Sequence, residues 1–415
     1  MTKARLRVAL FSSEYPPHVL GGLGVHVEKL TSELAAAVDF DLYAPAEGDY
    51  LTANSAVRVN EVPAASVRTD VEHWLSYCQA AARLAGASTR TADLVHCHDW
   101  MTVLAGVRLR QVTGKPLVYN VHLPQGKGLR GALENLGLLA ADIVLVNSQA
   151  VRSELLARGL PVRRIEVVPN GVDLETFRPA ADWPRDGGYV LFAGRLVAQK
   201  GVEVLLRAFD AVLRRCPESR LVIAGEGDLE LYLKGVARYL GFPDRVRMIG
   251  WQTGAALVEL YQGAQAVVVP SLYEPFGIVA LEAMACGRPV VASRVGGLEE
   301  ILEDAVEGYL VTRGDHLELA RRLAGLILDP QLRERMGAAA RRRAEGFGWE
   351  RTAEDTLTLY HGLTGHVAGP LPDAAAAVYK DELLAAVGGT VGGAIEELLD
   401  LAELAPVYRT AGGTP

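Results

Sequence analysis

The sequence predicts an α/β protein with two doubly wound, parallel-sheet domains. Short apolar runs that suit buried strands alternate with helical patterns along the chain. The alternation occurs in two series, and the stretch between them carries two prolines, a glycine pair and several charges. With 415 residues, the chain is too long for one core of ordinary size and suits two domains.

The first series, residues 1–173, is predicted to form the N-terminal domain. It opens with a strand over 7–11, a glycine-rich loop at 21–24 and a helix over about 25–37. Further strands are predicted in the runs DFDLYA, DLVHCH, PLVYNVH, ADIVLVNS and IEVVPNG. Because helical patterns separate these runs, we expect a parallel sheet that is covered by helices.

The second series, residues 189–347, follows a predicted linker over 174–188. Its strands are expected in YVLFAGR, RLVIAGEG, RVRMIGW, AVVVPS, PVVASR and GYLVT, and residues 315–347 are predicted to be helical. In doubly wound sheets, ligands bind outside the carboxyl ends of the strands. Two such domains that face each other would form a deep cleft.

The last part of the chain is predicted to hold two helices. An amphipathic pattern predicts one over 349–363. The extension 366–415 is rich in alanine and glycine, and one helix is expected there over 379–404. No residue of this extension suggests chemistry, so we interpret it as a packing helix with a frayed end.

Composition limits the classes of function. Half of the residues are hydrophobic, and the mean hydropathy is +0.15, as in a well-packed globular enzyme. The formal net charge of −8 argues against a nucleic-acid partner, and the basic run at 341–343 is interpreted as a solvated helix face.

Cysteine usage and hydropathy predict a cytoplasmic protein without an integral membrane segment. The four cysteines are scattered, with no CxxC pair, which favours reduced thiols. No apolar run approaches the roughly 20 residues of a membrane span. The apolar run VALF near the N-terminus is too short for a signal peptide.

Two cations are predicted at the carboxyl end of the first strand in the second series. Arg195 follows that strand, and Lys200 is expected to begin the next helix. An arginine fork and a lysine point charge suit a diphosphate, although a pair of solvated surface cations is the alternative. The glycines at 21–24 form either a phosphate loop or a plain tight turn, because the GxGxxG spacing is absent.

Two glutamates lie at a predicted helix over 277–285, which Gly287 is expected to end. The free amides near Gly277 and Ile278 would attract an anion. Glu274 precedes the helix, and Glu282 lies about 6 Å further along its axis. The two carboxylates could thus accept hydrogen bonds from hydroxyls on both sides of a diphosphate, as in a nucleotide sugar. The alternative is that Glu274 caps the helix and Glu282 pairs with an arginine.

Histidines end two strands of the first series. His122 could donate a hydrogen bond to a sugar hydroxyl or to a developing charge, or be purely structural. His96 and His98 should share one face of their strand, but no third ligand lies nearby in sequence, so no metal site is predicted. His98, Asp99 and Trp100 are instead expected to line a sugar-binding wall.

Taken together, these segments resemble family 4 of the retaining glycosyltransferases. The E-x7-E pattern from Glu274 to Glu282 lies within YEPFGIVALEAMACGRPVVAS, and GRLVAQKG, VPNGVD, the glycine loop and FGWERTAEDTLTLY occur in the family's order. The resemblance covers about residues 5–365. The segments SSEYPPHVLGGLGVHV and HCHDW look most like the bacterial glycogen synthase branch.

The resemblance implies a GT-B architecture, in which two Rossmann-like domains face each other across a cleft and the C-terminal one binds the donor. The helix over 348–365 would cross back to the N-terminal domain. The implied catalytic residues are His122, Glu274, Arg195 and Lys200. The implied donor-binding residues are Gly22, Arg195, Lys200, Glu274, Phe276, Gly277, Ile278 and Glu282. The acceptor is assigned to Glu14, His98, Asp99 and Trp100.

The function implied is retaining transfer of glucose from a nucleoside-diphosphate glucose to an α-glucan, with ADP-glucose favoured over UDP-glucose. A nucleotide sugar is the co-substrate, and no other cofactor and no metal are expected. A front-side path is preferred, in which the leaving phosphate takes the acceptor's proton. The alternatives are another acceptor (glucose 1-phosphate, a lipid or a surface polysaccharide), a nucleotide-sugar epimerase and a silent sugar-binding protein.

Overall fold

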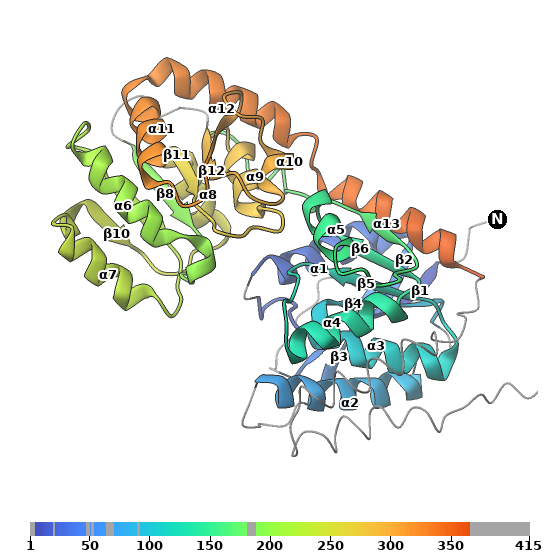
Figure 1. The fold of residues 1–415 in the computed structure, drawn as a ribbon. Coiled ribbons are helices and arrows are strands. Elements are labelled where there is room, and N and C mark those ends of the chain that lie inside the picture. Colours follow the sequence, from blue (N-terminus) through green and yellow to red (C-terminus); the bar gives the residue numbers. More distant parts are fainter. Residues whose placement is uncertain are drawn as a thin grey trace, which may run out of the picture. The chain divides into compact units, whose positions relative to one another are not determined.

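The computed structural model describes residues 5–19, 21–46, 50, 54–63, 70–88, 92–180 and 188–365. Its contacts divide the chain into two units, each with its own parallel sheet (Figure 1). The N-terminal unit contains Met1–Val146, Glu154–Glu166 and the segment that begins at Thr356. The C-terminal unit contains Asn147–Ser153 and Val167–Asp355. The predicted fold class, two doubly wound α/β domains, is thereby confirmed.

The N-terminal sheet has seven strands in the order β3-β2-β1-β4-β5-β6-β7. Helices α2, α3 and α4 pack next to one another along it (Figure 1). From β1 the chain adds β2 and β3 on one side of the sheet and then β4 to β7 on the other side. The topological switch point therefore lies between β1 and β4. The elements are β1 (Leu6–Phe11), α1 (Gly22–Glu33), η1 (Leu34–Ala36), β2 (Val38–Pro45), β3 (Val57–Val62), α2 (Asp70–Ser88), β4 (Leu94–His98), α3 (Asp99–Thr113), β5 (Leu117–Val121), α4 (Leu129–Ala140), β6 (Ile143–Val146), α5 (Gln149–Leu156) and β7 (Ile165–Val167).

Two features of this unit differ from the sequence-based expectation. Strand β3 was not predicted, because its sequence VRVNEV interrupts the apolar run with three polar residues, as suits the edge of a sheet. Helix α1 begins at Gly22 instead of about residue 25, so two of the loop glycines form its first turn.

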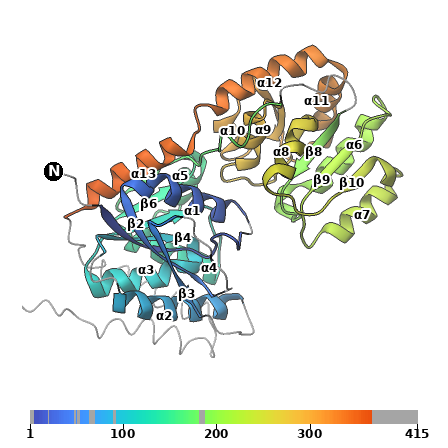
Figure 2. The same cartoon turned by 180° about the vertical axis from the view of Figure 1, so that it is seen from behind.

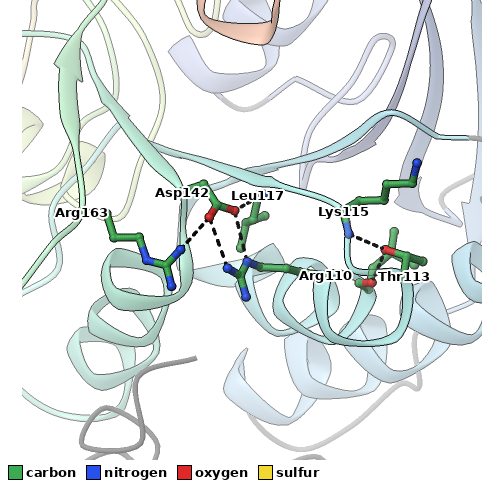
Figure 3. Close-up of polar contacts among 7 residues, drawn as sticks. Arg110, Thr113, Lys115, Leu117, Asp142 and Arg163 are labelled. Atoms are coloured by element: carbon green, nitrogen blue, oxygen red, sulfur yellow. Dashed lines mark hydrogen bonds and ion pairs between the residues drawn. The ribbon is translucent and has the colours of Figure 1, made fainter. Parts of the chain in front are cut away.

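A charged cluster ties the carboxyl end of α3 to the start of β6 (Figure 3). The Asp142 carboxylate accepts two hydrogen bonds of 3.2 Å from the Arg110 guanidinium, one of 2.9 Å from Arg163 and one of 2.9 Å from the backbone amide of Leu117. The Arg110 side chain is only 3% exposed. A single carboxylate therefore holds together α3, β5 and the segment before β7.

We expect Asp142→Ala to destabilise the N-terminal unit by about 3 kcal/mol, because it leaves the buried Arg110 charge without this carboxylate. Hydrogen exchange of β5 and β6 amides in the full chain would measure the loss. The control is Asp210→Ala, which removes an exposed ion pair with Arg214 and should cost less than about 1 kcal/mol. Equal effects of the two substitutions would contradict the assignment.

The C-terminal sheet has six strands in the order β10-β9-β8-β11-β12-β13, all parallel. Its switch point lies between β8 and β11. The elements are β8 (Tyr189–Ala193), η2 (Ala198–Lys200), α6 (Val202–Leu213), β9 (Leu221–Ala224), α7 (Glu230–Tyr239), η3 (Pro243–Arg245), β10 (Val246–Met248), α8 (Gly254–Gly263), β11 (Ala264–Val269), α9 (Ile278–Ala285), β12 (Val290–Ser293), α10 (Leu298–Ile301), β13 (Gly308–Val311), α11 (His316–Leu328), α12 (Pro330–Ala344) and α13 (Trp349–Leu363).

Alternation along β8 sends its side chains into two separate cores. Val190 and Phe192 pack with α6, α7 and α11 on one face of the sheet. Leu191 and Ala193 pack with α8, α9 and part of α12 on the other face. The two views of the ribbon show this layering of helices about the sheet (Figures 1 and 2). Strand β8 is thus buried on both faces of the sheet.

Helix α13 has the bounds predicted from the sequence, and it begins in the C-terminal unit and ends in the N-terminal unit. The helix expected over 379–404 and residues 181–187 of the linker expected over 174–188 lie outside the described residues. Among the helices that the structure describes, none is both long and apolar enough to cross a membrane.

Candidate active site

Lys200 and Glu274 meet at the carboxyl ends of β8 and β11, at the switch point of the C-terminal sheet. Lys200 Nζ lies 2.7 Å from Glu274 Oε2, and the Ser271 hydroxyl donates a 2.8 Å hydrogen bond to the same oxygen. The two charged side chains are only 20% and 10% exposed. The structure therefore brings together two of the predicted site residues, which are 74 positions apart in sequence.

The loop that carries Lys200 is held against the end of β11. Gly201 has φ +65°, and a Cβ there would lie 2.0 Å from the carbonyl oxygen of Pro270. This left-handed residue separates the 3-10 turn η2, which ends at Lys200, from α6. The expectation that Lys200 begins the helix is thus wrong, because Gly201 interrupts the backbone before α6 starts at Val202.

The N-terminus of α9 lies directly after Glu274. Gly277, which has no side chain, is its N-cap with φ +113°, and no side chain in the described ranges accepts a hydrogen bond from the first-turn amides. Because Glu274 bonds to Lys200 and Ser271, the alternative in which it caps this helix is wrong. Phe276 is 4% exposed and packs in the core, so its side chain is not available to a ligand. The backbone amides near Ile278 are the groups that this turn can offer to an anion.

Glu282 lies further along α9 and has a partner that was not expected. The Tyr261 hydroxyl of α8 donates a 2.7 Å hydrogen bond to Glu282 Oε2, in place of the arginine considered from the sequence. Burial raises the pKa of Glu282 to about 7, and the hydrogen bond from Tyr261 opposes this rise. This carboxylate therefore titrates near neutral pH.

Arg195 follows β8, as predicted, and its side chain is exposed. Within the described part of the chain, no carboxylate forms an ion pair with it. It remains a cation that could meet an anionic ligand on this side of the sheet.

Four histidines gather near the switch point of the N-terminal sheet. His98 Nδ1 lies 2.9 Å from His122 Nε2, and the ring centroids of His26 and His122 are 4.6 Å apart. The His96 ring lies 4.3 Å from that of His98, so both share one face of β4, as predicted. Burial lowers the pKa values of His98 and His122 well below the ordinary value, and further histidines add to the effect. These imidazoles are therefore neutral at pH 7.

Sequence reasoning missed His26, which enters this cluster from α1. Its side chain is 2% exposed and lies 3.3 Å from the Asn120 side chain. Its neighbours in space are between 70 and 100 positions away in sequence, so no local spacing could reveal the group. The signal available was its position on the buried face of a predicted helix that follows the first strand.

Asp99 holds the segment that carries His122. Its Oδ1 accepts hydrogen bonds from the backbone amides of His122 at 2.7 Å and of Leu123 at 3.4 Å. Asp99 has φ +56°, a strained conformation for a residue with a side chain. Burial raises its pKa to about 8. Asp99 therefore fixes the backbone of the segment that carries His122.

The structure buries most of the expected sugar-binding wall of His98, Asp99 and Trp100. The three residues are 0%, 5% and 6% exposed, because α3 begins directly at the end of β4 and turns them inward. Trp100 also has the Arg130 guanidinium over its ring, at 5.2 Å from the centroid.

Glu14 caps α1, which changes the expected roles of two residues. Its Oε2 accepts hydrogen bonds from the amides of Gly21 at 3.1 Å and Gly24 at 3.2 Å. The carboxylate that was assigned to an acceptor is thus bound to its own chain. Gly22, which was expected to approach phosphates, is exposed in the first turn of this already capped helix.

Comparison with known families agrees with this architecture. Residues 20–176 match the family described as Glycosyltransferase Family 4, and residues 173–343 match Glycosyl transferases group 1. The two matches together cover the strands and loops that carry Lys200, Glu274, Glu282 and His122.

Three named relatives span most of the chain. A D-inositol 3-phosphate glycosyltransferase of Kribbella flavida is 34% identical and aligns over 84% of this chain and 92% of its own length. A glycogen synthase of Mycobacterium tuberculosis is 32% identical over 86% and 94%. An alpha-maltose-1-phosphate synthase of Mycolicibacterium smegmatis is 32% identical over 86% and 100%. These relatives differ in the acceptor that their names imply.

Among solved structures, a sucrose-phosphate synthase from Thermosynechococcus elongatus superposes with a TM-score of 0.78 at 26% identity, over 86% of this chain and 99% of that one. The match extends through both Rossmann-like units. The chain therefore belongs to glycosyltransferase family 4 and is a hexosyltransferase with GT-B architecture.

Proposed function

We propose that this enzyme transfers glucose, with retention, from a nucleoside-diphosphate glucose to the non-reducing end of an α-glucan. The observation that carries the proposal is the Lys200–Glu274 pair beside the uncapped N-terminus of α9. This arrangement offers a cation and backbone amides to a diphosphate, and a carboxylate to the sugar next to it.

The pairing of Lys200 with Glu274 leaves both groups able to bind a donor. An ammonium has three N–H donors, and Glu274 engages one of them. Within the residues that the structure describes, the hydrogen bonds to Glu274 end on Oε2. Oε1 can therefore accept from a sugar hydroxyl while Oε2 holds Lys200 in place.

Breaking the anomeric bond leaves negative charge on the diphosphate. Lys200, Arg195 and the α9 amides would stabilise this charge, which is where preorganised groups contribute most to rate. Glu282 would accept hydrogen bonds from the ribose hydroxyls. His122 would donate to the sugar near the reacting carbon. The leaving phosphate then takes the proton of the acceptor hydroxyl, so that no enzyme nucleophile is needed.

The α-glucan acceptor and the preference for ADP-glucose rest on the resemblance to the glycogen synthase branch and on the glycogen synthase relative. A phosphorylated acceptor is the second candidate, because other relatives are named for inositol phosphate and maltose 1-phosphate chemistry. The four buried cysteines are all free, which supports a cytoplasmic location.

A panel of donors and acceptors tests the proposal. Purified enzyme with EDTA would receive ADP-glucose or UDP-glucose, together with glycogen, maltose, glucose 1-phosphate, inositol 3-phosphate or no acceptor. Release of nucleoside diphosphate that depends on glycogen would support it. Release that requires a phosphorylated acceptor would favour the second candidate. Conversion of the donor to another nucleotide sugar with no acceptor present would indicate an epimerase.

Glu282→Ala is expected to raise the KM for the nucleotide sugar by about tenfold or more, with little change in kcat. A hydrogen bond to a charged group contributes about 1.5–3 kcal/mol, and this one forms equally in the ground and transition states. Initial rates over a range of donor concentration would measure it. A Glu282→Ala enzyme with unchanged KM would remove Glu282 from the donor site.

The same contact predicts a dependence on pH. With a pKa of about 7, Glu282 becomes protonated as the pH falls, and it then loses acceptor capacity for the ribose. The KM for the donor should therefore rise between pH 8 and pH 6. Tyr261→Phe removes the hydrogen bond that lowers this pKa, so the rise should begin at a higher pH in that variant.

A further inference from the structure

We propose that His26, His98 and His122 form a binding site for a transition-metal dication such as Zn²⁺, and that an occupied site inhibits the transferase. The three imidazoles each offer one nitrogen, and these nitrogens all lie within 4.8 Å of one another. The metal-binding half stands on the geometry alone. The inhibitory half also rests on the role proposed for His122.

Three different elements bring these residues together. His26 comes from α1, His98 is the last residue of β4, and His122 directly follows β5. They are 2%, 0% and 9% exposed, so the nitrogens converge inside the N-terminal unit and not on its surface. The sequence prediction of no metal site relied on the lack of a third ligand near His96 and His98, and the fold supplies two further histidines.

The spacing is close to what zinc requires. Zinc–nitrogen bonds of about 2.0–2.1 Å at tetrahedral angles place ligand nitrogens about 3.4 Å apart. The His98 and His122 nitrogens lie 2.9 Å apart, and the widest separation in the group is at most 4.8 Å. Zinc binding would therefore close the widest pair by at most about 1.4 Å and open the His98–His122 pair by about 0.5 Å. Three histidines leave a fourth position for water.

The protonation states also suit a cation. The contact between His98 Nδ1 and His122 Nε2 joins two ring nitrogens, so one carries a proton and the other a lone pair. When both facing nitrogens bind a metal, each must offer a lone pair. The proton then moves to the second nitrogen of its own ring, and no proton leaves the pair of histidines. Where His98 carries this proton, the receiving atom is His98 Nε2, which is buried and to which none of the described residues bonds.

Occupancy would remove His122 from the donor sugar. A metal bound at this nitrogen trio fixes the imidazole that is proposed to donate a hydrogen bond near the reacting carbon. The cation would therefore lower kcat, and EDTA would restore it.

Cobalt binding to the full chain tests the site without any substrate. Protein treated with EDTA and then desalted is titrated with Co²⁺, and visible absorption and equilibrium dialysis report geometry and stoichiometry. We expect about one Co²⁺ per chain with an intense tetrahedral spectrum, displaced by Zn²⁺. His26→Gln should weaken binding by about tenfold or more, since one of three protein ligands is lost. The control His316→Gln, which changes a histidine of α11, should bind as the wild type does.

Two results would overturn the site: no tetrahedral spectrum with the wild type, or equal binding by wild type and His26→Gln. His26→Asn serves as a second variant, and circular dichroism confirms that each protein is folded. Inhibition is then measured with the active donor and acceptor pair, over the Zn²⁺ range that fills the site. Bound zinc without inhibition would refute the inhibitory half. Absence of any transferase activity would count against the proposed function and leave the binding result intact.

Discussion

Lys200→Ala is expected to lower kcat by about 100-fold to 1000-fold. The substitution removes a preorganised cation from the position where the leaving diphosphate gains charge, and loss of one such group typically has this effect. It also leaves Glu274, whose side chain is 10% exposed, without its ion-pair partner. The expected loss therefore lies in turnover as well as in donor binding.

The control for this prediction is Lys234→Ala, on α7. Lys234 also pairs with a glutamate, Glu230, but both side chains are substantially exposed. Its removal should leave kcat and KM unchanged. Single-turnover measurements with saturating donor would separate the chemical step from product release. If Lys200→Ala retained more than about a tenth of wild-type turnover, the assignment to the leaving group would fail.

His122→Ala is expected to lower kcat by about 100-fold, while the KM for the donor changes little. The proposed hydrogen bond from the imidazole strengthens as charge develops on the sugar, so its loss affects the transition state more than the ground state. His122→Gln keeps a hydrogen-bond donor at a similar distance and should recover part of the rate. His361→Ala, in the same unit but on α13, is the matched control.

A structural explanation of the His122 result must be separated from a chemical one. The backbone of His122 is held by Asp99, and this contact does not involve the imidazole. The fold should therefore survive the substitution, and hydrogen exchange at β4 and β5 would show this. A large loss of exchange protection together with the loss of rate would assign His122 to structure instead.

Much of the architecture could be predicted because it depends on local patterns. Helix α13 follows from an amphipathic repeat, and α9 lies between Gly277 and Gly287, both of which have positive φ. Strand β3 escaped prediction, because an edge strand needs no continuous apolar run. Its place becomes evident only through its pairing with β2.

The candidate site was predictable in part. Polar residues at strand ends marked Arg195, Lys200 and Glu274 in the second series and His122 in the first, because ligands bind outside the carboxyl ends of the strands in each such sheet. Their partners could not be predicted. That Tyr261 bonds Glu282, that Glu14 caps α1 and that His26 joins the histidine cluster all depend on contacts between segments that are far apart in sequence.

The division of α13 between the two units has a consequence for biosynthesis. Tyr360, near the end of this helix, bonds His96 Nδ1 at 2.6 Å inside the N-terminal unit. A ribosome therefore completes the entire C-terminal unit before the first unit receives its last helical turns. The N-terminal unit therefore cannot finish folding before the C-terminal unit has been synthesised. In nascent chains that are halted before Tyr360, the N-terminal unit should remain sensitive to protease. For the same reason, no single cut in the chain would release either unit intact.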